Sequence, residues 1–244
     1  MNKSSLTLVG VGPGDPSLLT LSAVKAIQNA TLVAYPVSQR GGDGIAATIA
    51  ASWIDERKKR LPLFFPMVCE SEPRKHAWKD ASEKLVSLVQ EGEEVAFLCQ
   101  GDVSLFASAS YVLLYIKAKH PQCSVKLIPG VTAISAAAAA GVWPLALQDD
   151  RLLVSPTPND SQDLEVLLDD AAYFRQVLAL MKLGDRWTWV RPLLEKKGLL
   201  EQSLFAQRIG FSDEQVMIAS EVSATMKPYF SLLLIRQSWP EVLP

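Results

Sequence analysis

A glycine-rich turn that directly follows an apolar segment near the start of the chain most constrains the fold. Residues 6–11 (LTLVGV) are apolar and rich in β-branched side chains, which predicts a buried strand. The glycines of residues 10–14 (GVGPG) tolerate positive φ, and the proline among them is rigid, so we expect a sharp turn with an open backbone surface. Asp15-Pro16 then predicts a helix start, because Asp caps free amides and Pro suits the first helical position.

Strand, glycine turn and helix are also the parts of nucleotide-binding loops, but neither common motif fits. The dinucleotide fingerprint G-x-G-x-x-G needs two residues before its third glycine, and here there is one. A phosphate loop ends in G-K-[ST], whereas Asp15 follows Gly14 and would repel a phosphate. Taken alone, the stretch fits an ordinary turn of an α/β domain about equally well.

Strands and helices alternate through the first half of the chain, which predicts parallel βαβ units. Ligands bind at the carboxyl ends of the strands in such sheets. The loops at Gly12, Tyr35, Gly101 and Pro129 all follow strands, so we expect them to gather on one edge. The predicted strands after the first are 31–35, 61–65, 94–99 and 124–128, and the predicted helices are 20–29, 45–53, 74–90, 104–120 and 133–140.

The alternation of predicted strands and helices breaks off and begins again around residues 145–151, which predicts two domains, 1–146 and 147–244. Later strands leave no room for helices between them, so part of the second sheet should be antiparallel. The predicted fold class is therefore α/β, with a mostly parallel N-terminal sheet that has helices on both faces and a mixed C-terminal sheet. The predicted C-terminal elements are strands 152–155, 177–181, 203–208, 216–219 and 229–236, and helices 164–172 and 190–197, with Gly198 as a C-cap.

Composition argues against several classes of function. A net charge of −2 and a pI near 5.8 disfavour a general nucleic-acid binder. The uncharged stretch 127–148 contains two prolines and two glycines, so we expect a soluble, cytoplasmic protein without membrane association. The cysteines form no C-x-x-C pair and the histidines are isolated, so no metal site is predicted (Cys69, Cys99, Cys123, His76, His120).

Several motifs together resemble the tetrapyrrole methyltransferases. The opening Gly12-Pro13-Gly14-Asp15-Pro16 resembles the start of that family, and Gly101-Asp102 with Phe106 resembles its G-D-P-x-x-Y segment. Residues 129–133 resemble its P-G-V-T-S segment. Four more segments resemble the precorrin-2 C(20)-methyltransferase branch in particular: Tyr35-Pro36, Met181-Lys182, Arg208-Ile209-Gly210 and Tyr229-Phe230-Ser231-Leu232.

This resemblance implies a function in cobalamin biosynthesis. It implies methyl transfer from S-adenosylmethionine to C-20 of precorrin-2 or cobalt-factor II, in a cleft between the domains of a homodimer. The many tryptophans, six in all, also favour a homodimer, because a symmetric interface would bury apolar surface. The cofactor-binding residues implied by the motifs are Gly12, Pro13, Gly14, Gly101, Asp102, Leu105, Thr132, Ala133 and Met181.

The expected substrate-binding residues are Tyr35, Arg40, Phe106, Lys182 and Arg186. The three cations among them lie on loops after strands and would meet the carboxylates of a tetrapyrrole. Asp102 has two interpretations: a cap of the following helix, or a charge that faces the cofactor. We predict the second.

The sequence departs from the family pattern at four positions. Val103 replaces a proline, Phe106 a tyrosine, Ala133 a serine, and Pro36 the acid proposed as a base in uroporphyrinogen-type relatives. No general base is therefore identified. Two alternatives remain: another ring-carbon methyltransferase of the corrin or sirohaem pathway, and a non-catalytic module that binds S-adenosylmethionine or a tetrapyrrole.

Overall fold

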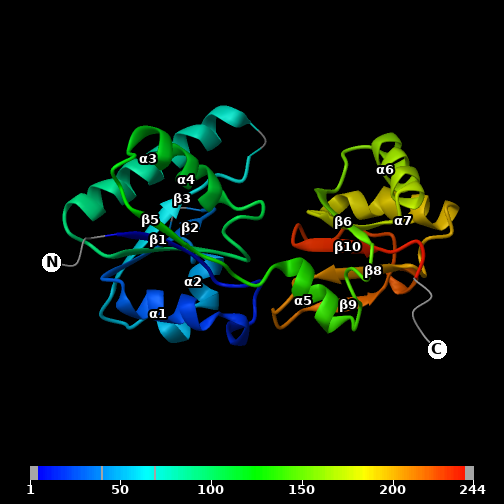
Figure 1. The fold of residues 1–244 in the computed structure, drawn as a ribbon, viewed down its shortest axis with the longest axis horizontal. Coiled ribbons are helices and arrows are strands. Elements are labelled where there is room, and N and C mark those ends of the chain that lie inside the picture. The colour runs from blue at the N-terminus through cyan, green and yellow to red at the C-terminus, as the bar shows by residue number, and fades with distance from the viewer. Residues whose placement is uncertain (1–4, 40, 69, 240–244) are drawn as a thin grey trace. The chain divides into compact units, whose positions relative to one another are not determined.

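The computed structural model describes residues 5–39, 41–68 and 70–239 (Figure 1). Its chain divides into two compact units, residues 1–132 and 133–244. The division therefore falls before helix α5 (Ala133–Ala140), whereas the sequence predicts a boundary after residue 146. It falls there because α5 packs against strand β10 (Ser231–Ile235) of the second unit, and the following Gly141 lies against Leu204.

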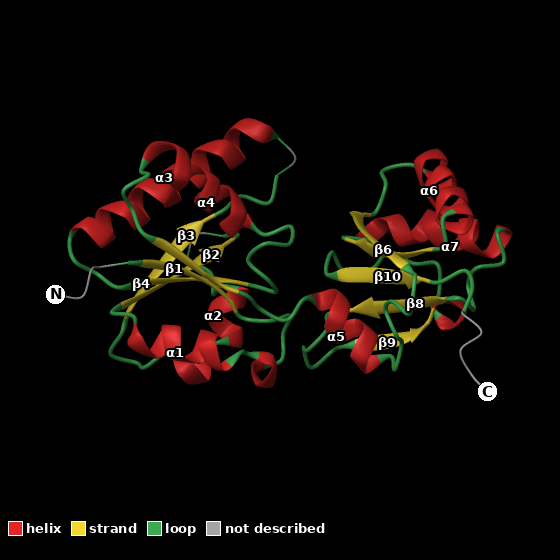
Figure 2. Ribbon diagram, viewed as in Figure 1, coloured by secondary structure: helices red, strands yellow, loops and turns green. Residues whose placement is uncertain are grey.

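The first unit contains a five-stranded sheet in the order β3-β2-β4-β1-β5, and every pair of neighbours is parallel. Helices α3 and α4 lie on one face of this sheet, and α1 and α2 lie on the other (Figures 1 and 2). The predicted parallel sheet with helices on both faces is confirmed. Its strands are β1 (Leu6–Gly10), β2 (Leu32–Val37), β3 (Lys59–Phe64), β4 (Val95–Cys99) and β5 (Val125–Ile128), and its α-helices are α1 (Leu21–Asn29), α2 (Ile45–Ile49), α3 (Ser71–Gln90) and α4 (Ser108–Lys119).

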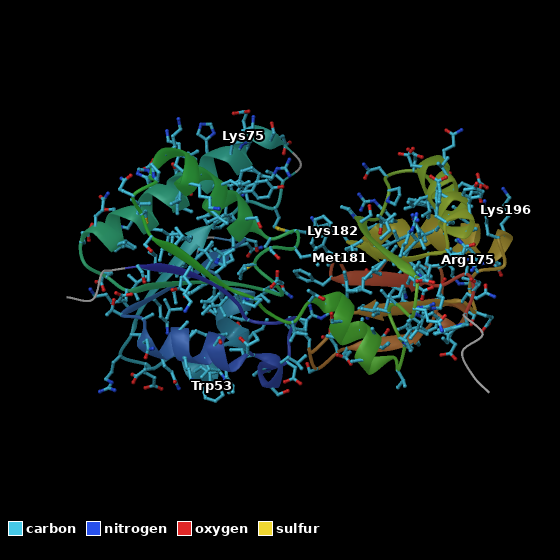
Figure 3. All side chains as sticks on the ribbon, viewed as in Figure 1. Trp53, Lys75, Arg175, Met181, Lys182 and Lys196 are labelled. Atoms are coloured by element: carbon cyan, nitrogen blue, oxygen red, sulfur yellow. The ribbon has the colours of Figure 1, made fainter. Side chains whose placement is uncertain are left out.

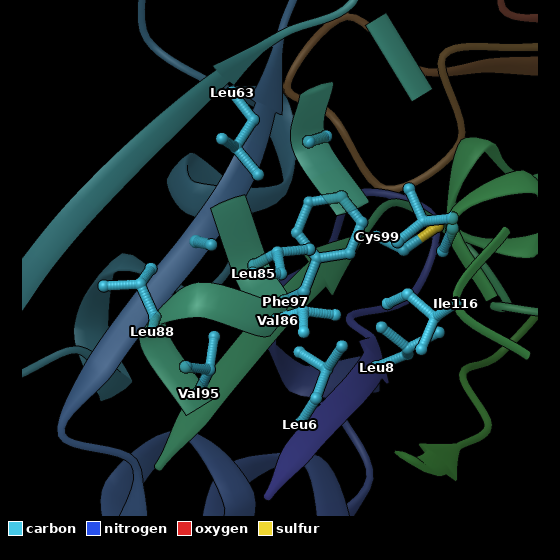
Figure 4. Close-up of a cluster of buried hydrophobic side chains, with 14 of the residues drawn as sticks. Leu6, Leu8, Leu63, Leu85, Val86, Leu88, Val95, Phe97, Cys99 and Ile116 are labelled. Carbon is cyan, nitrogen blue, oxygen red and sulfur yellow. The ribbon is translucent and has the colours of Figure 1, made fainter. Parts of the chain in front are cut away.

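A core of buried apolar side chains holds this unit together between the sheet and the pair α3 and α4 (Figure 4). Leu6, Leu8 and Phe97 come from the central strands and are fully buried. Leu85 and Ile116 come from α3 and α4 and are also inaccessible to solvent. Burial of such side chains contributes about 1.5–3 kcal/mol each, so this core fixes the central strands and the loops that follow them.

The second unit contains a mixed sheet in the order β6-β7-β10-β8-β9. Only β6 and β7 are parallel; β10 runs antiparallel to β7 and β8, and β9 is antiparallel to β8, as the short connections predict. Helices α6 and α7 cover one face, around the buried Trp187 and Phe205 (Figure 2). The remaining bounds are β6 (Arg151–Pro156), α6 (Ser161–Tyr173), β7 (Gln176–Met181), α7 (Trp187–Lys196), β8 (Ser203–Gln207) and β9 (Gln215–Ile218).

Three predicted element ends are wrong for local reasons. Strand β2 continues through Pro36, because β4 pairs with it only as far as Ala34 and the proline therefore interrupts no ladder on that side. The helix predicted from Ser104 begins at Ser108, after a turn in which Phe106 has φ +51°. The helix expected at Asp15-Pro16 is a single 3₁₀ turn (Pro16–Leu18), which Asp15 caps through the Ser17 amide.

Among the described residues, none of the helices has both the length and the apolar character that crossing a membrane requires.

Candidate functional site

Three loops of the first unit meet beyond the carboxyl ends of the adjacent strands β1, β4 and β5. Gly12 and Gly101 exchange two backbone hydrogen bonds: the Gly12 amide donates to the Gly101 carbonyl at 3.2 Å, and the Gly101 amide donates to the Gly12 carbonyl at 2.7 Å. The Gln100 side-chain amide also donates to the Pro13 carbonyl at 3.0 Å. We call residues 10–14, 100–106 and 129–132 the loop cluster. Its formation confirms that the loops at Gly12, Gly101 and Pro129 gather on one edge.

Glycine backbones allow the three loops to approach closely. A Cβ atom on Gly130 would lie 2.1 Å from the Gly101 carbonyl oxygen, and one on Gly10 would lie 2.6 Å from the Gly130 nitrogen. Neither distance is possible, so only glycine fits at these two positions. Gly10 and Gly130 were not among the predicted site residues, although both belong to the glycine motifs of the sequence.

The prediction of an open backbone surface at residues 12–14 is wrong, because these residues are buried; the open position lies in the next loop of the cluster, at Gly101. No atom approaches within 4 Å of the position that a Cβ would take on Gly101, and its φ is +70°. Gly12 also has a left-handed backbone, with φ +80°, but it is buried and its Cβ position lies 3.4 Å from the Leu18 carbonyl oxygen. Pro13 and Gly14 are buried as well. The cluster thus offers a ligand an uncovered stretch of backbone beside Gly101.

Asp102 ties two of the loops together. Its Oδ1 accepts hydrogen bonds from the Ser104 amide at 2.8 Å and the Ser104 hydroxyl at 2.5 Å, and its Oδ2 accepts one from the Gly130 amide at 2.9 Å. Burial acts to raise the pKa of this carboxyl, but the bonds from Ser104, Gly130 and Val103 outweigh it and lower the pKa below its usual range. Asp102 is not the cap of α4, because that helix begins six residues later.

The other predicted residues of this region lie at the margin of the cluster. Leu105 is half-buried, and Phe106 is exposed in its left-handed conformation. Thr132 and Ala133 are half-buried; Thr132 ends the first unit and Ala133 begins α5.

Tyr35 is half-buried in β2, where its ring packs against Gly44. A Cβ on Gly44 would lie 2.5 Å from Cδ2 of that ring, so any larger residue at position 44 would displace the Tyr35 ring. Arg40, the other candidate from this part of the chain, lies outside the described residues.

A second set of candidates lies along one edge of the second unit's sheet. Strand β10 is antiparallel to both of its neighbours, so its first residues lie beside the last residues of β7 and β8. Leu232 pairs with Met181, and Ser231 pairs with Gln207. This register brings Met181 and Lys182 to the same edge as Arg208 (Figure 3 labels Met181 and Lys182). We call this group, with Arg186, the cationic edge.

Two cations of this edge have left-handed backbones, namely Lys182 with φ +58° and Arg208 with φ +48°. Such conformations in non-glycine residues are uncommon and cluster at functional sites. Arg208 forms an ion pair with Asp213 at 2.6 Å and lies over the Phe211 ring. The sequence analysis quoted Arg208 within a motif but did not assign it to the site.

Arg186 braces two loops of the second unit. Its guanidinium donates to the Lys182 carbonyl at 3.2 Å and to the Asn159 side-chain oxygen at 2.6 Å. The loop after β6 is also bound to β7, since the Thr157 amide donates to the Met181 carbonyl at 2.7 Å. These bonds fix the backbone around Met181 and Lys182.

The loop cluster of the first unit offers backbone groups, and the cationic edge of the second unit offers cations. Over the described ranges, no group of three or more His, Cys, Asp or Glu side chains is placed to hold a metal ion. Burial raises the pKa of the Cys99 thiol, at the end of β4, to about 12, so this cysteine is a packing group and not a nucleophile.

Comparisons with known proteins agree on the relationship. The chain is 32% identical over 241 residues to the cobalamin biosynthesis protein CobIJ of Mycobacterium bovis, covering 96% of this chain and 46% of that protein, so it spans about half the length of this relative. It is 28% identical to the cobalt-precorrin-2 C(20)-methyltransferase of Salmonella typhimurium, covering 96% and 97% of the two chains.

A solved structure has the same fold. The uroporphyrin-III C-methyl transferase of Thermus thermophilus, complexed with S-adenosylhomocysteine, matches with a TM-score of 0.63 and 20% identity, covering 96% of this chain and 98% of that one. The family Tetrapyrrole (Corrin/Porphyrin) Methylases matches residues 5–223. With its motifs in order along both units, the chain belongs to the tetrapyrrole methylase family.

Proposed function

We propose that this protein transfers a methyl group from S-adenosylmethionine to C-20 of precorrin-2 or cobalt-factor II, in cobalamin biosynthesis. The observation that carries the proposal is the loop cluster, in which three glycine-containing loops meet at the carboxyl ends of parallel strands and leave backbone uncovered at Gly101. The name of the Salmonella relative supports the choice of substrate. We do not favour a non-catalytic binding module, because the family and the Salmonella relative are named for methyl transfer.

The loop cluster fits a cofactor held mainly by backbone groups. The cofactor-binding residues that we propose, besides Asp102, are Gly12, Pro13, Gly14, Gly101, Leu105, Thr132, Ala133 and the apolar Met181. The solved Thermus relative is complexed with S-adenosylhomocysteine. The bound cofactor supplies an electrophilic methyl group on a sulfonium. The contribution of the protein is then to exclude water and to orient the methyl group toward the acceptor carbon, the effect that dominates such displacements.

The cationic edge fits the carboxylates of a tetrapyrrole. Lys182 and Arg186 are the predicted substrate cations, and the register of β7, β8 and β10 adds Arg208 to them. Each guanidinium can form a bidentate pair with a carboxylate. Tyr35 and Phe106 are the proposed contacts of the first unit with the ring, and Arg40 remains a candidate from the sequence alone.

A transfer assay tests the function directly. Purified protein is incubated with methyl-labelled S-adenosylmethionine and precorrin-2, with and without cobalt in the ring. We expect label at C-20 of one of the two forms. Binding of S-adenosylhomocysteine without any transfer would instead identify a binding module, and label at another ring carbon would identify a different methyltransferase of the pathway.

A variant separates the two proposed subsites. Lys182→Ala should raise the KM for the tetrapyrrole about tenfold, because one charge-assisted contact is lost, and should leave the affinity for S-adenosylhomocysteine unchanged. Lys196→Ala is the matched control, since Lys196 lies in α7 and forms an ion pair with the surface residue Glu165. Equal KM values for the two variants would remove Lys182 from the site.

We further propose a homodimer in the cytoplasm. Exposed apolar side chains on α4 support an interface there: Tyr111 is 48% exposed and stacks on the half-buried Trp78 of α3 at 3.9 Å between ring centroids, and Leu114 is 62% exposed. A dimer mass in light scattering at micromolar concentration is the expected result, and Leu114→Glu should shift it toward the monomer.

A further inference from the structure

We infer that Asp102 acts on the cofactor as a positioning residue, by holding the loop after β4 to the loop after β5, and not as a charge that touches the cofactor. This inference rests on the proposed function, because it assigns a task within the same site. It replaces the expectation that the Asp102 charge faces the sulfonium or the amino group.

The first observation behind this inference is the set of hydrogen bonds that the Asp102 carboxylate accepts. An ionised carboxylate only accepts, through about four lone-pair sites. Both Asp102 oxygens accept hydrogen bonds within the loop cluster, from Ser104 at 2.8 and 2.5 Å and from Gly130 at 2.9 Å. The residue is only 9% exposed. Its charge is therefore satisfied by the protein itself.

The second observation is how tightly Gly130 is enclosed by the other loops. Gly130 lies so close to Gly10 and to the Gly101 carbonyl that neither Gly10 nor Gly130 can carry a Cβ. A small rotation of the Gly130 peptide would bring it into collision with either neighbour. The hydrogen bond from its amide to Asp102 fixes that rotation, since charge-assisted bonds are short and strong. The carboxylate of Asp102 therefore joins the loop after β5 to the loop after β4 at Gly130.

Asp15 supplies a natural comparison within the same unit. Its Oδ1 accepts a hydrogen bond from the amide two residues on, Ser17, at 2.7 Å, which is the same local turn that Asp102 forms with Ser104. Asp15 has no bond to another loop among its contacts in the described chain. The two aspartates thus form the same local turn and differ in the hydrogen bond that Asp102 accepts from a second loop.

The test compares Asp102→Asn with Asp15→Asn. The asparagine of Asp102→Asn has one acceptor oxygen in place of two, so either Ser104 or Gly130 loses its partner. Affinities are measured by calorimetry for three ligands. S-adenosylmethionine carries both the sulfonium and the α-amino group of its methionine part, S-adenosylhomocysteine carries the α-amino group without the sulfonium, and methylthioadenosine carries neither of these two groups. We expect Asp102→Asn to weaken all three by the same factor, about tenfold, and Asp15→Asn to change each by less than about twofold.

Hydrogen exchange of the Gly130 amide measures the protection given by its hydrogen bond to Asp102, without any ligand. Exchange of this amide should be faster in Asp102→Asn than in the wild type and unchanged in Asp15→Asn. If Asp102→Asn fails to fold, Asp102→Ser takes its place, because the serine hydroxyl can accept from Ser104 but is too short to reach Gly130.

The outcomes separate the inference from the proposed function. A wild-type protein that binds none of the three ligands overturns the proposed function, and the role of Asp102 toward the cofactor with it. If the wild type binds them, a loss of affinity that is larger for the ligands with the sulfonium or the α-amino group than for methylthioadenosine shows a direct contact and overturns the inference alone. Unchanged affinities, or unchanged exchange at Gly130, also overturn it.

Discussion

Gly12 has φ +80°, a left-handed conformation that costs an L-residue about 1–2 kcal/mol. The space around it is less restrictive, because a Cβ would make ordinary contacts with Leu18. We therefore expect Gly12→Val to abolish cofactor binding through displacement of the backbone that pairs with Gly101, and not through a side chain that fills the site. Calorimetry with S-adenosylhomocysteine measures this.

Gly92 is the matched control for Gly12→Val. It has φ +97° just after α3, and no atom lies within 4 Å of its Cβ position. Gly92→Val should lower the melting temperature by a similar amount and leave cofactor affinity intact. Loss of affinity in both variants would point to general destabilisation and against a role of residues 12–14 in binding.

Single residues were predictable from the sequence where a motif fixes the backbone, and less so where contacts decide. The glycine turns at residues 12 and 101 follow from their spacing after strands, as does the place of Met181 and Lys182 at the end of a strand. The partners of Asp102 were not predictable, because Gly130 lies 28 residues away and the bond depends on the order of the strands. For the same reason Arg208 joins the cationic edge only once the pairing of β8 with β10 is known.

At the scale of elements, the connection from β2 to α2 determines where Tyr35 lies. Gly44 has φ −82°, which suits any residue, so alanine there is excluded by contact alone: its Cβ would lie 2.5 Å from the Tyr35 ring and 2.7 Å from the Pro36 carbonyl oxygen. Gly44→Ala should cost about 1–3 kcal/mol of stability and raise the KM for the tetrapyrrole, because the Tyr35 ring must move. Urea unfolding and initial-rate kinetics measure the two effects.

Gly42→Ala in the same loop is the control for this element, since its Cβ would come no closer than 3.4 Å to the Gln39 carbonyl oxygen. The free energy of unfolding of Gly42→Ala should differ from that of the wild type by less than about 0.5 kcal/mol. A normal KM in Gly44→Ala together with the loss of stability would mean that Tyr35 supports the fold and does not contact the substrate.

Elements as such were predictable, because short apolar runs alternate with helical segments through the first unit, and the last strands of the second unit follow one another with short connections. Their ends were less so. Proline predicts the end of β2, yet the strand passes through Pro36 where β4 no longer pairs with it. The turn before α4 was missed, because nothing local in residues 103–107 announces the positive φ of Phe106.

At the scale of the whole molecule, each unit has its own core, and the second unit also contains a buried ion pair between Arg236 and Asp150. Arg236 is 1% exposed; it donates to Asp150 at 2.6 Å and to the Pro144 and Leu145 carbonyls. Removal of one partner leaves a buried charge uncompensated, which costs about 3–5 kcal/mol. Asp150→Asn keeps an acceptor near the Leu147 amide, so we expect the lower end, about 3 kcal/mol, lost from the second unit.

Urea unfolding followed by hydrogen exchange distinguishes the units: peptides of β7 and β10 should lose protection in Asp150→Asn, while those of β1 and β4 keep theirs. The control is the exposed neighbour Asp149: Asp149→Asn should behave as the wild type.

Burial acts to raise the pKa of Asp150, but the Leu147 amide and the Arg236 guanidinium outweigh it and lower the pKa. The stabilisation is therefore complete above about pH 4, the unfolded value, and is lost as the pH falls through the lower folded value. The wild type and Asp150→Asn should accordingly converge in stability only in acid, and a constant difference down to pH 2 would show that the pair does not carry the effect.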